Sequence, residues 1–245
     1  MYDVDQLERD CADAWPAVVD EPLGQWRLRA AGGFTGRANS ALTIGDPGVP
    51  MDTAFARVME FAHGNGIAPA AHVVRGAPIE DNLARAGWAV NEQHSGGAES
   101  VVMTGELFGF AGPVPENVGV YSRPPAGWWP LAVDASRPTP AQERVLAGRR
   151  GLGFGSAVVH GAVVGIVRGA VVGELLHIAR LAVAPDHRLR GVATGLLTAL
   201  ASWAWQHGAS RAVLQVATHN KRAISLYAGL GCRPHHRYRY WVPGR

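Results

Sequence analysis

Hydrophobic and polar positions in the second half of the chain form strand-like runs followed by helical patterns. Two runs rich in β-branched residues, 153–159 and 162–172, flank His160-Gly161, a pair typical of a hairpin turn. A third run, 175–184, stops before a proline, and apolar residues then recur at helical spacing over 191–207. This order predicts a sheet with a long helix packed against it.

The predicted long helix has one apolar side and a clear end. Its apolar side consists of Val192, Leu196, Leu200 and Trp203. Gly208 follows, and glycine readily takes the left-handed conformation that ends helices.

Shorter patterns complete this half. Strands are predicted at 118–121, 212–216 and 237–242, and helices within 125–133, from Thr139-Pro140 to Arg149, and from Asn220 onward. The tail alternates as a strand should, and we expect Arg237 and Arg239 on the solvated face of an edge strand.

The first half repeats this order in weaker form. Strands are predicted at 26–30, 38–44 and 70–74, with an amphipathic helix at 51–63. Leu83-Ala84-Arg85-Ala86-Gly87-Trp88 matches residues 227–232 in spacing, with leucine in place of tyrosine.

A Gly/Pro-rich connector, 110–117, separates the two patterned halves. We therefore predict an N-terminal domain at 1–112 and a C-terminal domain at 113–245.

A basic loop of the form R-x-x-G-x-A joins the strand 175–184 to the long helix. The loop and the helix start comprise Arg188, Leu189, Arg190, Gly191, Val192, Ala193 and Thr194. A helix N-terminus presents unpaired N–H groups and a positive dipole end, which hold phosphate well. Gly191 permits close approach and Ala193 adds little bulk, so the loop predicts a pyrophosphate site. The alternative is an ordinary strand-to-helix turn with surface arginines.

The corresponding loop of the first half, 45–50, differs in chemistry. It has no arginine, and Asp46 repels a diphosphate, while Pro47 and Pro50 lack the N–H that would bind one. We predict that this half does not hold the same ligand.

A second motif, Asn220 to Cys232, has the form N-x-x-A-x-x-x-Y-x-x-x-G. Together with the basic loop it resembles the GNAT superfamily of acyl-CoA-dependent N-acyltransferases, over about residues 118–242. The resemblance implies an α/β (α+β) GNAT fold, with a mixed, mostly antiparallel sheet, flanking helices and two splayed parallel strands. The weaker first half indicates a tandem type with a degenerate GNAT-like N-terminal half.

The resemblance also implies a site for acetyl-CoA. Its binding residues are Leu181, Ala182, Val183, the loop and helix start 188–194, Asn220, Ala223 and Tyr227. A backbone N–H near Leu181 or Ala182 would polarise the thioester, and Tyr227 would protonate the departing thiolate. The alternatives are that Tyr227 is a core aromatic residue and that Asn220 only caps its helix.

The general base is open among three candidates. His177 aligns with the strand position where several GNAT enzymes place a glutamate, and imidazole titrates near neutrality. Glu174 is its rival, and a water chain without a single base is the third. A structural, hydrogen-bonded role is the alternative for His177.

The expected function is transfer of an acetyl group to a primary amine of a small molecule or peptide, by direct attack. Cys232 stands at a packing position unsuited to a nucleophile, which disfavours a covalent intermediate. A catalytically silent acyl-CoA-binding or regulatory protein is the main alternative, and a nucleic-acid-associated module is the third.

Composition narrows these classes. The chain has 245 residues, 47% of them apolar, enough for a packed core. A net charge of +3 with dispersed basic residues disfavours nucleic acid as a partner. The sequence contains no long apolar run, and we expect no signal peptide. Two distant cysteines form no disulfide framework, so we expect a cytoplasmic protein, monomeric or homodimeric. Cys232, His219, His235 and His236 lack zinc-site spacing, and no metal is expected.

One glycine-dense stretch, 32–40, allows two interpretations. It is either a flexible hairpin turn, or a segment that places Arg37 and Asn39 in the acceptor cleft to recognise a carboxylate or amide.

Overall fold

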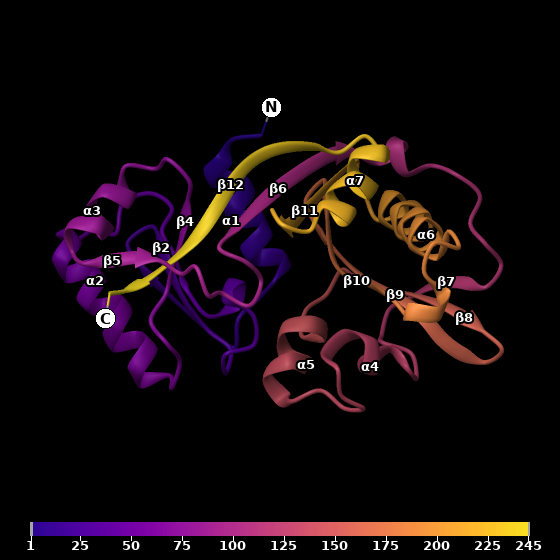
Figure 1. Cartoon of the computed structure of the whole chain (residues 1–245), viewed down its shortest axis with the longest axis horizontal. Coiled ribbons are helices and arrows are strands. Elements are labelled where there is room, and N and C mark those ends of the chain that lie inside the picture. The colour runs from indigo at the N-terminus through magenta and orange to yellow at the C-terminus, as the bar shows by residue number, and fades with distance from the viewer. Residues whose placement is uncertain (1, 245) are drawn as a thin grey trace. The chain divides into compact units, whose positions relative to one another are not determined.

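The computed structural model describes residues 2–244, which form two compact units. The first contains the chain up to Val102, with 216–221 and the segment from His235 onward, and the second contains 103–215 and 222–234. Figure 1 labels their helices and strands. The last part of the chain is thus built into the first unit.

The second unit is an α/β structure around a mixed sheet. In sheet order its strands are β11 (Arg211–Ala217), β10 (Leu175–Val183), β9 (Ala162–Val172), β8 (Leu152–Val159) and β7 (Val118–Tyr121). The β10–β9, β9–β8 and β8–β7 pairs are antiparallel, and β10–β11 is parallel. The predicted mixed, mostly antiparallel sheet is confirmed.

Helices cover both faces of this sheet. Helix α6 (Val192–Gln206) lies on one face, and α4 (Trp128–Val133) and α5 (Pro140–Ala147) lie on the other (Figure 1). The predicted start of α5 is confirmed, because Thr139 and Gln142 form a capping box there. The unit also holds most of α7 (Lys221–Gly229) and the short 3-10 helices η2 (Leu107–Phe110) and η3 (Pro185–His187).

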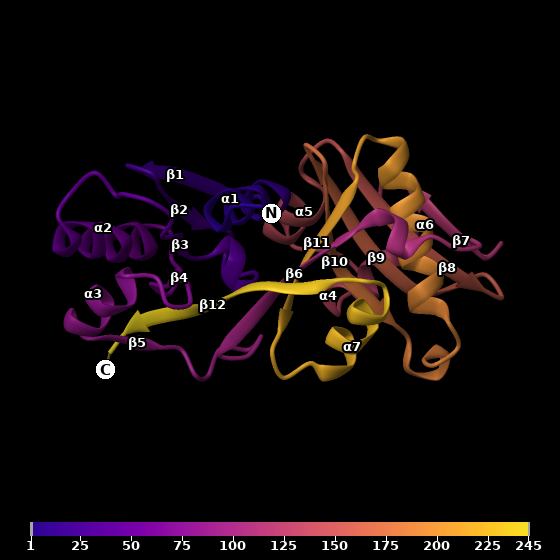
Figure 2. The same ribbon diagram turned by 90° about the horizontal axis from the view of Figure 1, so that it is seen from above.

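Helix α6 lies beside β7 and β8 (Figure 2), and it approaches the sheet closely because glycines of the strands face it. A Cβ added at Gly153 would lie 2.8 Å from the Trp203 ring. One added at Gly165 would lie 2.7 Å from Val192 and 3.0 Å from Leu196, and one at Gly169 would lie 2.8 Å from Leu200. The predicted apolar side of the helix is therefore the side that packs.

The parallel pair β10–β11 separates before either strand ends. Its register runs from Leu175↔Arg211 to Ile178↔Leu214 and goes no further. On the other edge of β10, pairing with β9 shifts between Ala179 and Ala182, which marks a β-bulge. Arg180 lies in this bulge with φ of 55°. The splayed parallel strands are thus present.

The strands of the first unit also include both parallel and antiparallel pairs. Its strands include β1 (Val19–Leu23), β2 (Trp26–Ala30), β3 (Ala41–Leu42), β4 (Ala71–Val74) and β12 (Arg233–Pro243), in that order, and β5 (Trp88–Val90) also pairs with β12. The β3–β4 pair is parallel, as β10–β11 is.

Three α-helices belong to the first unit, α1 (Val4–Ala14), α2 (Met51–Gly64) and α3 (Ile79–Arg85), together with the 3-10 helix η1 (Gly36–Ala38). Helices α2 and α3 supply Phe55, Val58 and Leu83 to a buried core that includes Trp26 and Trp88. This hydrophobic face explains why the helix predicted at 51–63 forms.

Two strand predictions need correction. The tail is an internal strand, because β12 lies between β4 and β6 (Glu99–Glu106), and Arg237 and Arg239 pair with Glu99 at 3.0 and 3.1 Å. The strand predicted at 38–44 is only Ala41–Leu42, because Gly36–Ala38 forms a 3-10 turn.

Two stretches of the chain share one connectivity. β3–α2–β4–α3–β5 follows the same order as β10–α6–β11–α7–β12, with a parallel pair joined through the first helix in each case. Among the described helices, none combines the length and apolarity needed to cross a bilayer.

Candidate acyl-transfer site

The basic loop leads into an uncapped helix start. Gly191 is the N-cap of α6 with φ of 77°, and it makes no side-chain capping bond. The first-turn N–H groups, those of Val192, Ala193 and Thr194, have no carbonyl partner within the helix, as at any helix start. A Cβ built on Gly191 meets no atom within 4 Å, so this position is open.

The residues before Gly191 shape the loop. The backbone of Leu189 is left-handed, with φ of 62°, and its side chain is 91% exposed. Such a conformation is strained for leucine and is common at ligand sites. Arg188 turns back toward the strand, and its Nε donates to the Val183 carbonyl at 3.1 Å. Arg188 and Arg190 are exposed.

Strand β10 leaves its parallel ladder with β11 before it reaches this loop. Ala182 and Val183 pair with β9 on one edge, while the parallel register with β11 ends at Ile178. The edge of β10 beyond Ile178 therefore lies outside the parallel ladder, where an amide-bearing ligand can pair with it. Leu181, Ala182 and Val183 are half-buried.

Tyr227 lies on α7 and is buried, with 6% of its surface exposed. Burial, and then the neighbouring Cys232, raise the pKa of its phenol. The hydroxyl thus stays protonated near neutral pH, as a proton donor requires.

Cys232 follows the helix in a packed position. Its backbone N–H donates to the Tyr227 carbonyl at 3.0 Å, and a Cβ added at Gly105 would lie 2.9 Å from its Sγ. Burial raises the pKa of the thiol to about 11. A thiol that holds its proton so firmly is a poor nucleophile near neutrality.

The two candidate bases lie at different places on β10. His177 is buried within the strand, and its Nε2 lies 3.5 Å from Oε1 of Gln215 on β11. Glu174 is exposed in the turn before β10, where its carboxylate accepts from Ser210 Oγ at 3.2 Å. Glu174 is at the opposite end of the strand from the basic loop, so the geometry separates it from the other predicted residues.

Asn220 and Ala223 flank the start of α7. The Asn220 N–H donates to the Ala217 carbonyl at 2.9 Å, which is a turn preceding the helix. By its contacts Asn220 belongs to the first unit and Ala223 to the second.

Sequence reasoning missed two arginines near this strand. Arg168 on β9 is fully buried, and its Nε donates to the Leu146 carbonyl at the end of α5 at 2.8 Å. Arg180 occupies the bulge of β10. A cation within an otherwise apolar strand was the available signal for both.

The interpretation of Asn39 as a ligand-recognising residue is wrong. Its Oδ1 accepts from the N–H groups of Ala31 and Gly33 at 2.7 and 2.9 Å, and its Nδ2 donates to the carbonyls of Phe34 and Thr35 at 2.8 Å. These four bonds use the full hydrogen-bonding capacity of the Asn39 amide. All four partners lie in the glycine-dense loop or directly before it, so the amide stabilises the fold of this loop. Arg37 lies over the Trp15 ring, 4.3 Å from its centroid.

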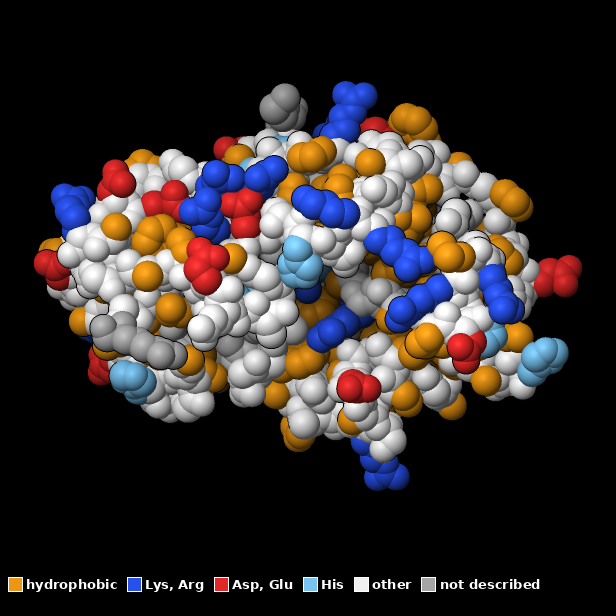
Figure 3. Space-filling view, in the orientation of Figure 1, with side chains coloured by type: hydrophobic (Ala, Val, Ile, Leu, Met, Phe, Trp, Pro, Cys, Tyr) orange, Lys and Arg blue, Asp and Glu red, His pale blue; other side chains and the backbone are white. Residues whose placement is uncertain are grey.

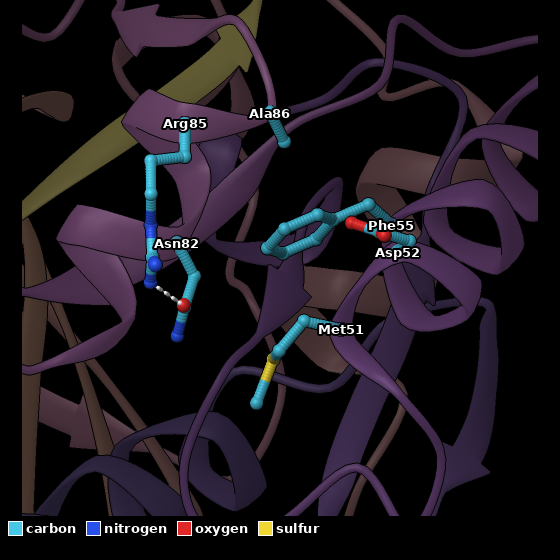
Figure 4. Close-up of a pocket in the computed structure, with 6 residues that line it drawn as sticks. All are labelled: Met51, Asp52, Phe55, Asn82, Arg85 and Ala86. Carbon is cyan, nitrogen blue, oxygen red and sulfur yellow. Dashed lines mark hydrogen bonds between the residues drawn. The ribbon is translucent and has the colours of Figure 1, made fainter.

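A cavity of about 250 Å³ lies in the first unit between α2 and α3. Its lining comprises Met51, Asp52, Phe55, Asn82, Arg85 and Ala86. Figure 4 shows the Arg85 guanidinium turned onto the Asn82 side chain, to which it donates a hydrogen bond. Over residues 2–244, no group of three or more His, Cys, Asp or Glu side chains is arranged to hold a metal ion.

Comparison with known proteins gives matches along nearly the whole chain. The family described as "Probable histone acetyltransferase Rv0428c C-terminal" matches residues 2–241. The protein named "Uncharacterized N-acetyltransferase YobR" from Bacillus subtilis is 26% identical over 255 residues, covering 98% of this chain and 99% of that protein.

Solved structures show the same fold. A GCN5-related N-acetyltransferase from Kribbella flavida has a TM-score of 0.71 at 15% identity, covering 100% of this chain and 97% of that one. A tandem GNAT protein from the clavulanic acid biosynthesis pathway has a TM-score of 0.65 at 16% identity, covering 96% and 86%. The sheet with its splayed parallel pair agrees with these likenesses, and the chain belongs to the family described as "Probable histone acetyltransferase Rv0428c C-terminal" and is a GNAT-type N-acetyltransferase.

Proposed function

We propose that the protein transfers an acetyl group from acetyl-CoA to a primary amine by direct attack, and that the second half, 113–245, does this work. The observation that carries the proposal is the open, uncapped start of α6 at Gly191, adjoining a strand whose parallel partner has separated. A helix start of this kind can hold phosphate, and a strand edge can pair with amides. Coenzyme A carries both groups, a diphosphate and an amide-bearing pantetheine arm.

The donor would be held by the backbone more than by side chains. The N–H groups of Gly191 to Thr194 would receive the diphosphate, and exposed Arg188 and Arg190 would add charge. Leu181, Ala182 and Val183 would pair with the amide-bearing arm, and Ala223 would contact it from the start of α7.

The transfer step needs one polarised carbonyl and two proton movements. The acceptor nitrogen attacks the thioester carbon while an N–H of Leu181 or Ala182 stabilises the developing oxyanion. The C–S bond then breaks, and the thiolate takes the Tyr227 hydroxyl proton, which this buried phenol retains near neutral pH. The proton lost by the amine goes to the base, and a proton from solvent restores the tyrosine.

We assign the base to His177 or to water that it orients, in preference to Glu174. His177 lies on the same strand as the bulge, whereas Glu174 is in an exposed turn at its far end. The raised pKa of Cys232 supports direct attack over an acetyl-cysteine intermediate.

Titration calorimetry with acetyl-CoA, followed by a thiol-release assay across pooled amines, tests the proposal. We expect binding of acetyl-CoA and amine-dependent thiol release. Binding without release from any amine would leave a carrier of acyl-CoA, and absence of binding would overturn the proposed donor.

A further inference from the structure

The bulge of β10 places an arginine in a conformation that arginine rarely adopts. Arg180 has φ of 55°, it is half-buried, and its Nε is inaccessible to solvent. The neighbouring strand pairs Arg168 with Ala179 and Ile166 with Ala182, so Arg180 and Leu181 together lie opposite the single residue Val167. The surrounding sheet therefore fixes this backbone.

A left-handed non-glycine residue is costly, and such strain is concentrated at functional sites. Glycine would fit this position with less strain, and a bulge commonly serves to re-aim a side chain. The presence of arginine at this position indicates that its cation is useful there.

The strands around the bulge are cationic. β9, β10 and β11 contain Arg168, Arg180 and Arg211 and no aspartate or glutamate. Arg168 donates to the end of α5, and Arg211 pairs with Glu106 at 3.0 Å beside the first residues of β10. In Figure 3, Lys and Arg side chains (blue) lie on the visible face of this unit. Of these three arginines, Arg180 is the one that lies in the bulge.

We infer that Arg180 is a specificity-determining residue that recognises an anionic group, a carboxylate or phosphate, on the amine acceptor. The inference rests on the proposed function, which puts the thioester carbonyl at Leu181 and Ala182, directly after Arg180. The donor's diphosphate is assigned to the loop beyond Val183, about 10 Å of extended strand away, so it does not require this cation. A guanidinium at the bulge binds a carboxylate in a bidentate manner and repels a lysine-rich peptide.

The test uses amines that differ only in charge. Glycine and glycinamide, β-alanine and β-alaninamide, and phosphoethanolamine and ethanolamine form the pairs, and a lysine-rich peptide is added. We expect kcat/KM for at least one anionic member to exceed that of its neutral partner by about 10- to 100-fold, the range of a charged hydrogen bond. The carboxylate and phosphate pairs separate the two anion types.

Two variants test whether the Arg180 side chain causes the preference for anionic amines. Arg180→Asn removes the charge with a residue that tolerates left-handed backbone, and it should abolish the preference while the acetyl-CoA Kd stays unchanged. Arg180→Lys should keep part of it, and the control Arg150→Gln, at an exposed position, should keep all of it. Thermal unfolding of each variant shows that it is folded.

Equal rates within every pair, a faster reaction with the lysine-rich peptide, or a preference that survives in Arg180→Asn would overturn the inference. Acetyl-CoA binding without turnover of any pair would also overturn it. Failure of the wild-type protein to bind acetyl-CoA would instead overturn the proposed function.

Discussion

The two β–α–β segments of the chain differ most at the point where the strand meets the helix. Before α2 the loop 45–50 is occupied by its own bonds, because Asp46 Oδ1 accepts from the Gly48 N–H at 2.7 Å and the Gly45 carbonyl accepts from Trp26 Nε1 at 2.9 Å. Before α6 the loop ends in Gly191, which faces open space. Both loops lead into a helix that packs through buried apolar residues.

The comparison separates the requirements of the fold from those of the site. Both helices form because their apolar faces pack, and neither has a side-chain N-cap. Pro50 at the N-cap of α2 has no N–H to offer a ligand, whereas Gly191 leaves its own N–H and space beside it. Both units have a helix at this point. Of the two helix starts, the one at Gly191 has the N–H group and the open space that anion binding needs.

The largest expected effect comes from filling the open position. Gly191→Val should remove detectable acetyl-CoA binding, because its side chain enters space that meets no protein atom and that we assign to the diphosphate. Gly208→Val is a matched control, since Gly208 ends the same helix with φ of 88° and equally open surroundings. Both variants should lose about 1–2 kcal/mol of stability from left-handed strain. Calorimetry would contradict the site if both bound acetyl-CoA alike.

The second-largest effect is expected at Tyr227, the proposed acid on α7. Leu83 stands at the matching position of the first unit. Tyr227→Phe should lower kcat about 100-fold, the lower range for general acid catalysis, with a smaller change in the acetyl-CoA Kd. Tyr121→Phe is the control because Tyr121 is 46% exposed on β7. Steady-state thiol release with unchanged kcat in Tyr227→Phe would remove this residue from the mechanism.

The buried ionisable groups of the first unit should make the stability of the protein depend on pH. Glu8 Oε2 lies 3.1 Å from His72 Nε2, and Glu8 Oε1 lies 2.7 Å from His236 Nε2. Burial lowers the pKa of His72 below the ordinary 6.5. Burial alone would raise the pKa of Glu8, but His72 and His236 lower it below 4.5.

In both cases the unfolded chain takes up a proton before the folded one. Stability should therefore fall as pH drops below about 6.5 through His72, by up to about 1.4 kcal/mol per pH unit, and fall again below about 4.5 through Glu8. Urea unfolding between pH 7.5 and 4 measures both windows. The exposed variant His63→Gln should keep the slope, while His72→Gln should lose the part that begins just below pH 6.5. A flat profile in the wild type would contradict the assignment.

The smallest effect is at the silent loop. Asp46→Ala removes the bond to the Gly48 N–H and should cost about 1 kcal/mol of stability, with no change in acetyl-CoA affinity. Arg188→Ala should show the reverse, weaker acetyl-CoA binding with little change in stability, because Arg188 is exposed. Weaker acetyl-CoA binding in Asp46→Ala would mean that the first unit takes part.

Sequence patterns predicted most of the second unit because its elements have strong local signals. Ala162–Val172 and Val118–Tyr121 coincide with the predicted strands, and Thr139 and Gly208 mark helix ends by capping chemistry. The order of strands in the first unit was harder, because β12 reaches it from the far end of the sequence. No local periodicity reveals which strand a tail will pair with, and Arg237 and Arg239 therefore resembled a solvated edge.

The site shows the same limit. The loop 188–194 could be predicted because its function resides in backbone N–H groups that glycine and helix periodicity reveal. The bulge that contains Arg180 could not, because a register shift between Ala179 and Ala182 depends on the pairing with β9 and leaves no trace in alternation. The sequence also left two interpretations of Asn39 open, because its four partners come from the fold of its own loop.

A crystal structure with coenzyme A bound would examine the central claim most directly. We predict one molecule of coenzyme A per chain, with its diphosphate against the main-chain amides of residues 191–194 and its arm along β10 beyond Ile178. A diphosphate at the loop 45–50, a second bound molecule, or a ligand that avoids Gly191 would contradict it.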